Sequence, residues 1–242
     1  MSDEAPHAGI AASSSRAASD GASAEARDPG RLPLQRRHGG LSVDDGTPAA
    51  VLARLFEGNR RFFSGAARHG HDVTDARRRA EKPTPSTLMI GCIDSRVPPE
   101  AIFDQPFGEI LSMRTAGHLL DRAALASVEL AVSRMRVPLI VVLGHENCAA
   151  VEYAVDATHR GEHPDGVLGY LVRQIAPSVP MDEALSGTQT YEGAVRGHVA
   201  SVVAGVRAVP TVAEAVADGR LGVAGVRYGV TYGRAELLIE PA

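Results

Sequence analysis

The stretch Ser86–Gln105, STLMIGCIDSRVPPEAIFDQ, decides the fold class of this chain. It runs an apolar segment directly into Cys92-Ile-Asp-Ser-Arg, so one of only two cysteines in 242 residues stands at the end of a predicted buried strand. A second apolar run, VPLIVVLG at residues 137–144, ends in the same way, with His145 and then Cys148. Short apolar runs of this kind are typical of the fully buried strands of a parallel sheet.

Predicted helices alternate with these strands. Thr47 and Pro48 provide an N-cap and a first position for a helix whose apolar residues recur at helical spacing. We predict further helices over 121–136, 148–160, 166–179 and 191–209, and a strand over 109–115. The Gly-rich segment 221–240 indicates a hairpin or an edge strand. The sequence therefore predicts an α/β fold, with a mainly parallel central sheet flanked by helices.

Composition limits where the chain works and what it binds. Residues 1–45 are rich in Ala, Ser, Gly, Asp and Arg, so we predict a disordered tail before a folded domain at 46–242. A net charge of −4 and a pI near 6.1 argue against a nucleic-acid partner. No apolar run is long enough for a membrane span, and the N-terminus lacks the features of a signal peptide. With two cysteines and no export signal, we expect a cytoplasmic protein with reduced thiols.

The polar residues at the two strand ends predict a metal site, because functional residues of open α/β sheets gather at the carboxyl ends of strands. If β structure continued through Cys92, Asp94 and Arg96, their side chains would share one face. His145 and Cys148, three residues apart at the start of a predicted helix, can converge on one point. Cys, His and Cys, with an optional Asp, are suitable Zn²⁺ ligands, and three protein ligands plus water is the pattern of a catalytic zinc site.

Each of these residues also has a simpler interpretation. A cysteine in an apolar run can be a small buried apolar residue, and a lone histidine can be a hydrogen-bonded structural residue. Asp94 and Arg96 can form a simple ion pair. The coincidence of all of them at two equivalent strand ends favours zinc.

The motifs CIDSR (92–96) and HENC (145–148) resemble the C-x-D-x-R and H-x-x-C pair of the β-class carbonic anhydrases. The resemblance extends over about residues 48–240, in the ordered blocks EGNRRF, DSRVPPEAIFD, RTAGHLLD, SVELAV, VPLIVVLGHENC and IAPSV. It implies a zinc enzyme that hydrates CO₂ reversibly to bicarbonate and a proton, through attack of zinc-bound hydroxide on CO₂. It also implies a homo-oligomer, dimer or tetramer, in which the helix from about Pro48 crosses to the partner.

The resemblance assigns roles residue by residue. Cys92, His145 and Cys148 would hold Zn²⁺, while Asp94, kept off the metal by Arg96, would accept a hydrogen bond from the bound water. In a closed state the aspartate would instead become the fourth ligand. The bicarbonate-regulated branch of the family carries Trp three residues before the first cysteine; this chain has Met there and no Trp, so we expect no such regulation.

Several positions depart from the family pattern without removing a ligand. Ala149 replaces a usual Gly, Ile93 a frequent Ser or Gly, and Ser112-Met113 a common pair of Val. We interpret His118 and His198 as structural residues rather than proton shuttles, and the basic run 77–79 as a solvated helix face.

Two other functions are compatible with the same residues. One is a hydrolase of CS₂ or COS on this scaffold; the other is a zinc protein with a silent site, which would not need Asp94 and Arg96. A nucleotide-binding domain is excluded, because neither G-x-G-x-x-G nor a P-loop follows any predicted strand.

Overall fold

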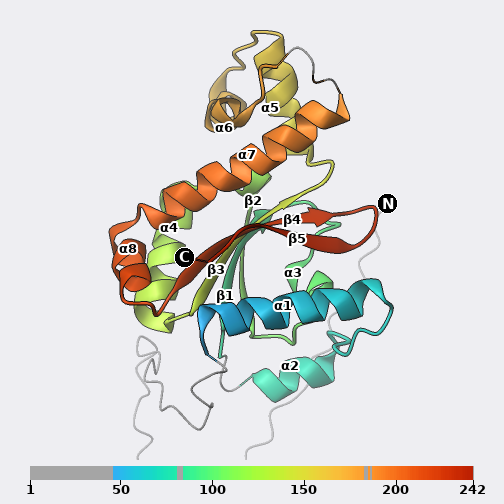
Figure 1. Cartoon of the computed structure of the whole chain (residues 1–242), viewed down its shortest axis with the longest axis vertical. Helices are drawn as coiled ribbons and strands as arrows, with labels where there is room; N and C mark the ends of the chain where they lie inside the picture. Colours follow the sequence, from blue (N-terminus) through green and yellow to red (C-terminus); the bar gives the residue numbers. More distant parts are fainter. Residues whose placement is uncertain (1–45, 81–83, 183–184, 186, 242) are drawn as a thin grey trace, which may run out of the picture. The chain divides into compact units, whose positions relative to one another are not determined.

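The computed structural model describes residues 46–80, 84–182, 185 and 187–241. In this part of the chain, one five-stranded sheet carries helices on both faces (Figure 1). The predicted disorder of residues 1–45 lies outside the described residues, and the domain boundary at 46 stays a prediction.

The sheet has the strand order β2-β1-β3-β4-β5. The first four strands in this order are parallel, and β5 pairs with β4 antiparallel as an edge strand. The prediction of a mainly parallel sheet is confirmed, and the Gly-rich segment forms both a hairpin and an edge strand. The strands are β1 (Thr87–Cys92), β2 (Ile110–Thr115), β3 (Leu139–His145), β4 (Gly222–Gly229) and β5 (Arg234–Ile239).

The two central strands explain the apolar runs in the sequence. Every residue of β1 and of β3 is buried, because helices cover both faces of the sheet, so neither strand alternates polar with apolar residues. The strands are in register from Thr87 opposite Leu139 onwards, which brings their carboxyl ends to the same edge.

The predicted helices are present with shifted ends. Thr47 caps α1 by accepting a hydrogen bond from the N–H of Ala50, and the helix predicted over 121–136 passes from α4 into a π turn that ends at the left-handed Arg136. Helix α2 contains the basic run 77–79 that we interpreted as a helix face, whereas α3 and α8 were not predicted from the sequence. The helices are α1 (Pro48–Phe63), α2 (Val73–Arg79), α3 (Pro99–Ile102), α4 (Arg122–Leu130), α5 (Ala149–His159), α6 (Gly166–Ile175), α7 (Thr188–Arg207) and α8 (Pro210–Ala217), with shorter turns at Ala116–His118, Ala131–Met135 and Ala176–Ser178.

The described residues include no single helix with the length and apolar composition of a membrane span; only α7 and α8 together, bent by 85°, reach those values.

The sheet separates two hydrophobic cores, and alternate residues of the same strand serve each. Ile90 belongs to the core beneath α4, α7 and α8, whereas Met89 belongs to the core beneath α1 and α3 (Figure 1). Helix α1 buries Val51, Leu52 and Leu55 in this second core of its own chain. That α1 also crosses to a partner stays a prediction. A third core joins α5, α6 and α7 to Cys92 at the carboxyl end of β1.

Candidate metal centre

The carboxyl ends of β1 and β3 bring three metal-binding side chains together. Cys92 is the last residue of β1, His145 is the last residue of β3, and Cys148 is the N-cap of α5. The ligand atoms of the three residues all lie within 4.8 Å of one another, and the two Sγ atoms are 3.8 Å apart. All three residues are buried, so the cluster predicted from the sequence is assembled in the structure.

The imidazole of His145 is oriented for metal binding. Its Nδ1 lies 2.9 Å from the backbone oxygen of Glu146, which fixes the proton on Nδ1 and leaves a lone pair on Nε2. This Nε2 is buried and has no hydrogen-bond partner among the described residues. A backbone carbonyl behind the ring is the usual support of a metal-binding histidine. The unpartnered nitrogen therefore fits a metal ligand.

The two thiols are electrostatically coupled. The pKa of Cys92 is lowered to about 4, chiefly because the Cys148 thiol donates a hydrogen bond to its sulfur, which outweighs the opposite effect of burial. The pKa of Cys148 is raised, because it donates that bond and is buried beside the Cys92 thiolate. The pair alone thus favours one thiolate. A dication bound between the sulfurs would favour two, and two thiolates with one imidazole are a donor set that suits Zn²⁺.

Asp94 and Arg96 form a tight pair beside this cluster. The Nε of Arg96 lies 3.0 Å from Oδ1 of Asp94, and Nη2 lies 2.6 Å from Oδ2. The pKa of Asp94 is lowered to about 2, chiefly because Arg96 donates these bonds. Arg96 also donates through Nη2 to the backbone oxygen of Asn147, at 2.9 Å, and so links the two loops that carry the ligands. Asp94 is not a member of the three-residue cluster, and its carboxylate is engaged by Arg96.

The local geometry that we predicted for these residues is wrong in two details. β1 ends at Cys92, so Asp94 and Arg96 lie in a turn, where Oδ1 of Asp94 accepts the N–H of Arg96 at 2.8 Å. His145 and Cys148 are not on one helix, because a turn with Asn147 at φ 53° separates β3 from α5. Tight turns after each strand, rather than regular periodicity, bring the side chains together.

Arg114 is a functional residue that the sequence reasoning missed. It lies on β2, donates through Nε to the backbone oxygen of Cys92 at 2.7 Å, and donates through Nη2 to the backbone oxygen of Asp94. It thus holds both ends of the Cys92–Asp94 turn. An arginine near the carboxyl end of a predicted strand was the available signal, since a partly buried charge needs a polar partner.

The sequence profile described as carbonic anhydrase matches residues 87–235, which includes every residue of the cluster. The chain belongs to the β-class carbonic anhydrase family.

Among its relatives, carbonic anhydrase 2 of Mycobacterium tuberculosis is 41% identical over 194 residues, which are 78% of this chain and 92% of the relative. Among solved structures, the Coccomyxa β-carbonic anhydrase in complex with acetazolamide aligns with a TM-score of 0.62 and 28% identity, over 79% of this chain and 87% of that one. A structure from a study of two tetrameric β-carbonic anhydrases of Sordaria macrospora shares the fold, with a TM-score of 0.59 and 24% identity, over 80% of this chain and 94% of that one.

The departures from the family pattern lie away from the metal-binding atoms. Ala149 is exposed at the first position of α5, so its methyl group does not press into the buried cluster. Ile93 is 62% exposed, and Met89 is fully buried in the core. His118 and His198 are buried, which agrees with a structural role, since neither can pass a proton directly to solvent. Arg77 is exposed, as predicted for a solvated helix face; the side chains of 78 and 79 lie outside the described residues.

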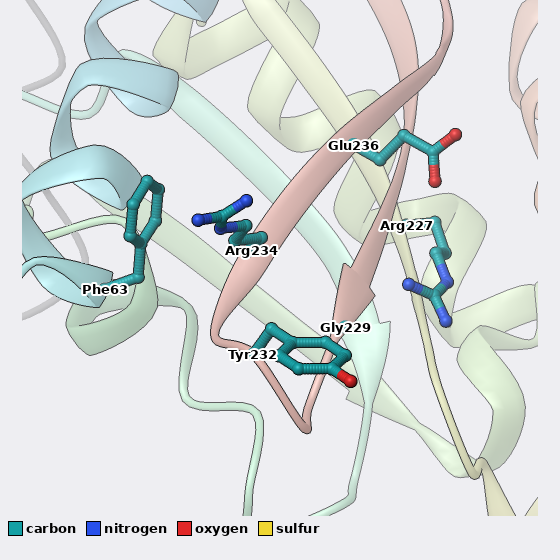
Figure 2. Close-up of a pocket in the computed structure, with 6 residues that line it drawn as sticks. All are labelled: Phe63, Arg227, Gly229, Tyr232, Arg234 and Glu236. Atoms are coloured by element: carbon teal, nitrogen blue, oxygen red, sulfur yellow. The ribbon is translucent and has the colours of Figure 1, made fainter.

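A hollow of about 610 Å³ lies at the β4–β5 hairpin, apart from the metal-binding cluster of this family member (Figure 2). Arg234 points toward Phe63 of α1 and lies 4.8 Å from the centre of its ring. The other lining charges are already paired, Arg227 with Glu192 and Glu236 with Arg196. The hollow therefore does not compete with the Cys-His-Cys cluster as the reaction site.

Proposed function

We propose that this carbonic anhydrase hydrates CO₂ reversibly to bicarbonate and a proton, with Zn²⁺ held by Cys92, His145 and Cys148. The observation that carries the proposal is the buried convergence of these three ligands beside an intact Asp94–Arg96 pair. Bound zinc would make a water molecule acidic enough to yield hydroxide near neutral pH, a property for which carbonic anhydrases are the standard example.

The residues of the chain would orient this chemistry. Two thiolates cancel the charge of Zn²⁺, so the water at such a site gains less acidity than one held by three neutral imidazoles. An ionised carboxylate next to that water offsets this loss by accepting its hydrogen bond. Arg96 keeps the carboxylate of Asp94 ionised and fixes its direction through two side-chain nitrogens. A silent zinc site would not need this pair.

We also propose a homo-oligomer, dimer or tetramer, in the cytoplasm. Ile93, next to a metal ligand, is 62% exposed, and Val167 and Leu168 on α6 are 85% and 53% exposed. Exposed apolar side chains of this size are typical of a surface that a partner covers. The cytoplasmic location rests on the reduced cysteines and on the sequence of the N-terminus alone.

The test is stopped-flow CO₂ hydration by protein of measured zinc content, at about pH 7 and pH 8.5. We expect one zinc per chain and rapid hydration, and Cys148→Ser should lose both. A steep gain between the two pH values would indicate a closed site that opens, with Asp94 as fourth ligand at rest. Full zinc content without CO₂ hydration at either pH would contradict the proposal, and product analysis with CS₂ and COS would then identify the alternative substrate class.

A further inference from the structure

Glu146, which follows the metal ligand His145, is bonded twice to the β4–β5 hairpin (Figure 2). Its N–H donates to the backbone oxygen of Tyr228 at 2.9 Å, directly after the last paired residues of β3 and β4. Its side-chain Oε2 accepts from the N–H of Thr231, at 2.9 Å, in the turn that joins β4 to β5. Backbone and side chain of the same residue are therefore both anchored to the hairpin.

The third polar group of Glu146 supports the metal ligand. Its backbone oxygen lies 2.9 Å from Nδ1 of His145 and accepts the proton of that nitrogen. The two bonds to the hairpin fix the nitrogen and the side chain of Glu146, and thereby the direction of its Cα–C bond. On the other side of the same peptide, Nη2 of Arg96 donates to the backbone oxygen of Asn147 at 2.9 Å. The peptide plane that carries the oxygen is thus held from both sides.

The hairpin is itself fixed by α1. Asn59, which is 2% exposed, donates to the backbone oxygen of Gly233 at 3.0 Å and accepts from the N–H of Ala235 at 2.9 Å. Its amide nitrogen also donates to the backbone oxygen of Ile102, at 2.9 Å. A buried amide that makes three such bonds holds the start of β5 in one place. The N–H of Thr231 is therefore presented from a firm base.

We propose that Glu146 is a positioning residue for the metal ligand His145: its carboxylate, bound to the N–H of Thr231, keeps its backbone oxygen against the imidazole. The inference rests on the proposed zinc function, because the direction of the ring matters to a bound ion. A charged acceptor makes a hydrogen bond roughly twice as strong as a neutral one, so a glutamate suits this position. Partners behind the ligands change metal affinity by about 10- to 100-fold when they are removed.

The test compares two substitutions of Glu146 by competition for zinc against a chromophoric chelator. Glu146→Ala removes the side-chain acceptor but leaves the backbone oxygen in the chain, so we expect the lower end of that range, a loss of about 10-fold in zinc affinity. In the zinc-loaded protein, the Nδ1 proton of His145, followed by ¹⁵N NMR, should exchange faster with water. Glu146→Gln keeps a neutral acceptor on a side chain of equal length and should return zinc affinity to within about three-fold of wild type.

The matched control is Asp75→Ala. Asp75 of α2 also accepts from a backbone N–H through its carboxylate, that of Phe107 at 3.1 Å, and Phe107 precedes β2 at the amino-terminal ends of the strands. The control should leave zinc affinity and the exchange of the Nδ1 proton unchanged.

Four results would overturn the inference. A folded Glu146→Ala that matches wild type in both quantities, or a control that changes them equally, would show that the role of Glu146 is only structural. If Glu146→Gln behaved like Glu146→Ala, the hydrogen bond would not be the cause. If wild-type protein bound no zinc, the proposed metal centre would be wrong and the inference would fall with it; the first three results would leave that centre in place.

A second measurement does not require a variant to fold. Coupling between two binding events is reciprocal, so zinc must strengthen the bond between Thr231 and Glu146 by the factor by which that bond strengthens zinc binding. In wild-type protein, the amide of Thr231 should exchange about 10-fold more slowly with zinc than without it. The amide of Phe107, which is also bonded to a carboxylate, is the internal reference. Equal effects of zinc on the two amides would contradict the positioning role.

Discussion

Replacing Arg114 with Met should weaken zinc binding without unfolding the protein. The change removes the donors to the backbone oxygens of Cys92 and Asp94 and keeps a side chain of similar length. Two hydrogen bonds from a charged group contribute roughly 3–6 kcal/mol together. Water reaching the freed carbonyls recovers part of this. We expect about 1.4–2.8 kcal/mol to appear as lost metal affinity, a 10- to 100-fold rise in the zinc dissociation constant.

The assay is competition for zinc against a chromophoric chelator, with circular dichroism to verify the fold. Arg207→Met is the matched control, because Arg207 also donates to two backbone oxygens, those of Val223 at 2.6 Å and Glu240 at 2.8 Å. Val223 lies near the start of β4, at the amino-terminal ends of the parallel strands, whereas the metal ligands lie at their carboxyl ends. The control should lower thermal stability and keep zinc affinity within about two-fold. Unchanged zinc affinity in folded Arg114→Met, or equal losses in both variants, would refute the reasoning.

Three further predictions concern other parts of the molecule. Arg96→Gln should retain zinc but lose about 100-fold in CO₂ hydration, because Asp94 is no longer oriented; stopped-flow rates near wild type would disprove this. Asp104→Asn should cost about 2–3 kcal/mol in urea unfolding at pH 7, since the buried carboxylate accepts from Arg61 and from two backbone N–H groups. Burial alone would raise the pKa of Asp104, but the three donors lower it below its ordinary value of 3.8. The stabilisation is therefore present above pH 3.8 and is lost as the pH falls from there through the lowered pKa, so the difference between the two proteins should shrink only below pH 3.8; a difference that stays constant there would contradict the account. Gly58→Ala should destabilise the fold by about 3 kcal/mol, because the new Cβ would lie 1.7 Å from a backbone oxygen of the turn after α3; an unchanged melting temperature would count against that packing.

The sequence could predict the strands and the ligands because both leave short-range signals. The apolar runs of β1 and β3 require cover on both faces, and parallel strands place their ends at one edge, so Cys92, His145 and Cys148 followed from pattern alone.

The partners of Arg114 could not be predicted in this way, because they are backbone atoms far away in the chain. A charge on a predicted strand indicates that a polar partner exists but not which one it is, and Arg114 donates to the carbonyl of Cys92, 22 residues away. Backbone oxygens have no sequence signature. The turn between His145 and Cys148 was missed for a related reason. Asn147 has a left-handed backbone conformation, and the sequence pattern does not indicate the direction that the chain takes after it.

The wide spacing of the ligands along the chain has a consequence for how the protein acquires its metal. Cys92 and Cys148 are 56 residues apart and meet only when two neighbouring strands are paired. In an unfolded chain, Cys92 is a single thiol and His145 with Cys148 is a separate pair, and neither alone is expected to bind a metal ion tightly. Because three apolar cores pack against the sheet, we expect folding to come first and metal uptake second. Under the proposed function, a chain that folds before it meets zinc would then be able to bind the metal later, without new synthesis.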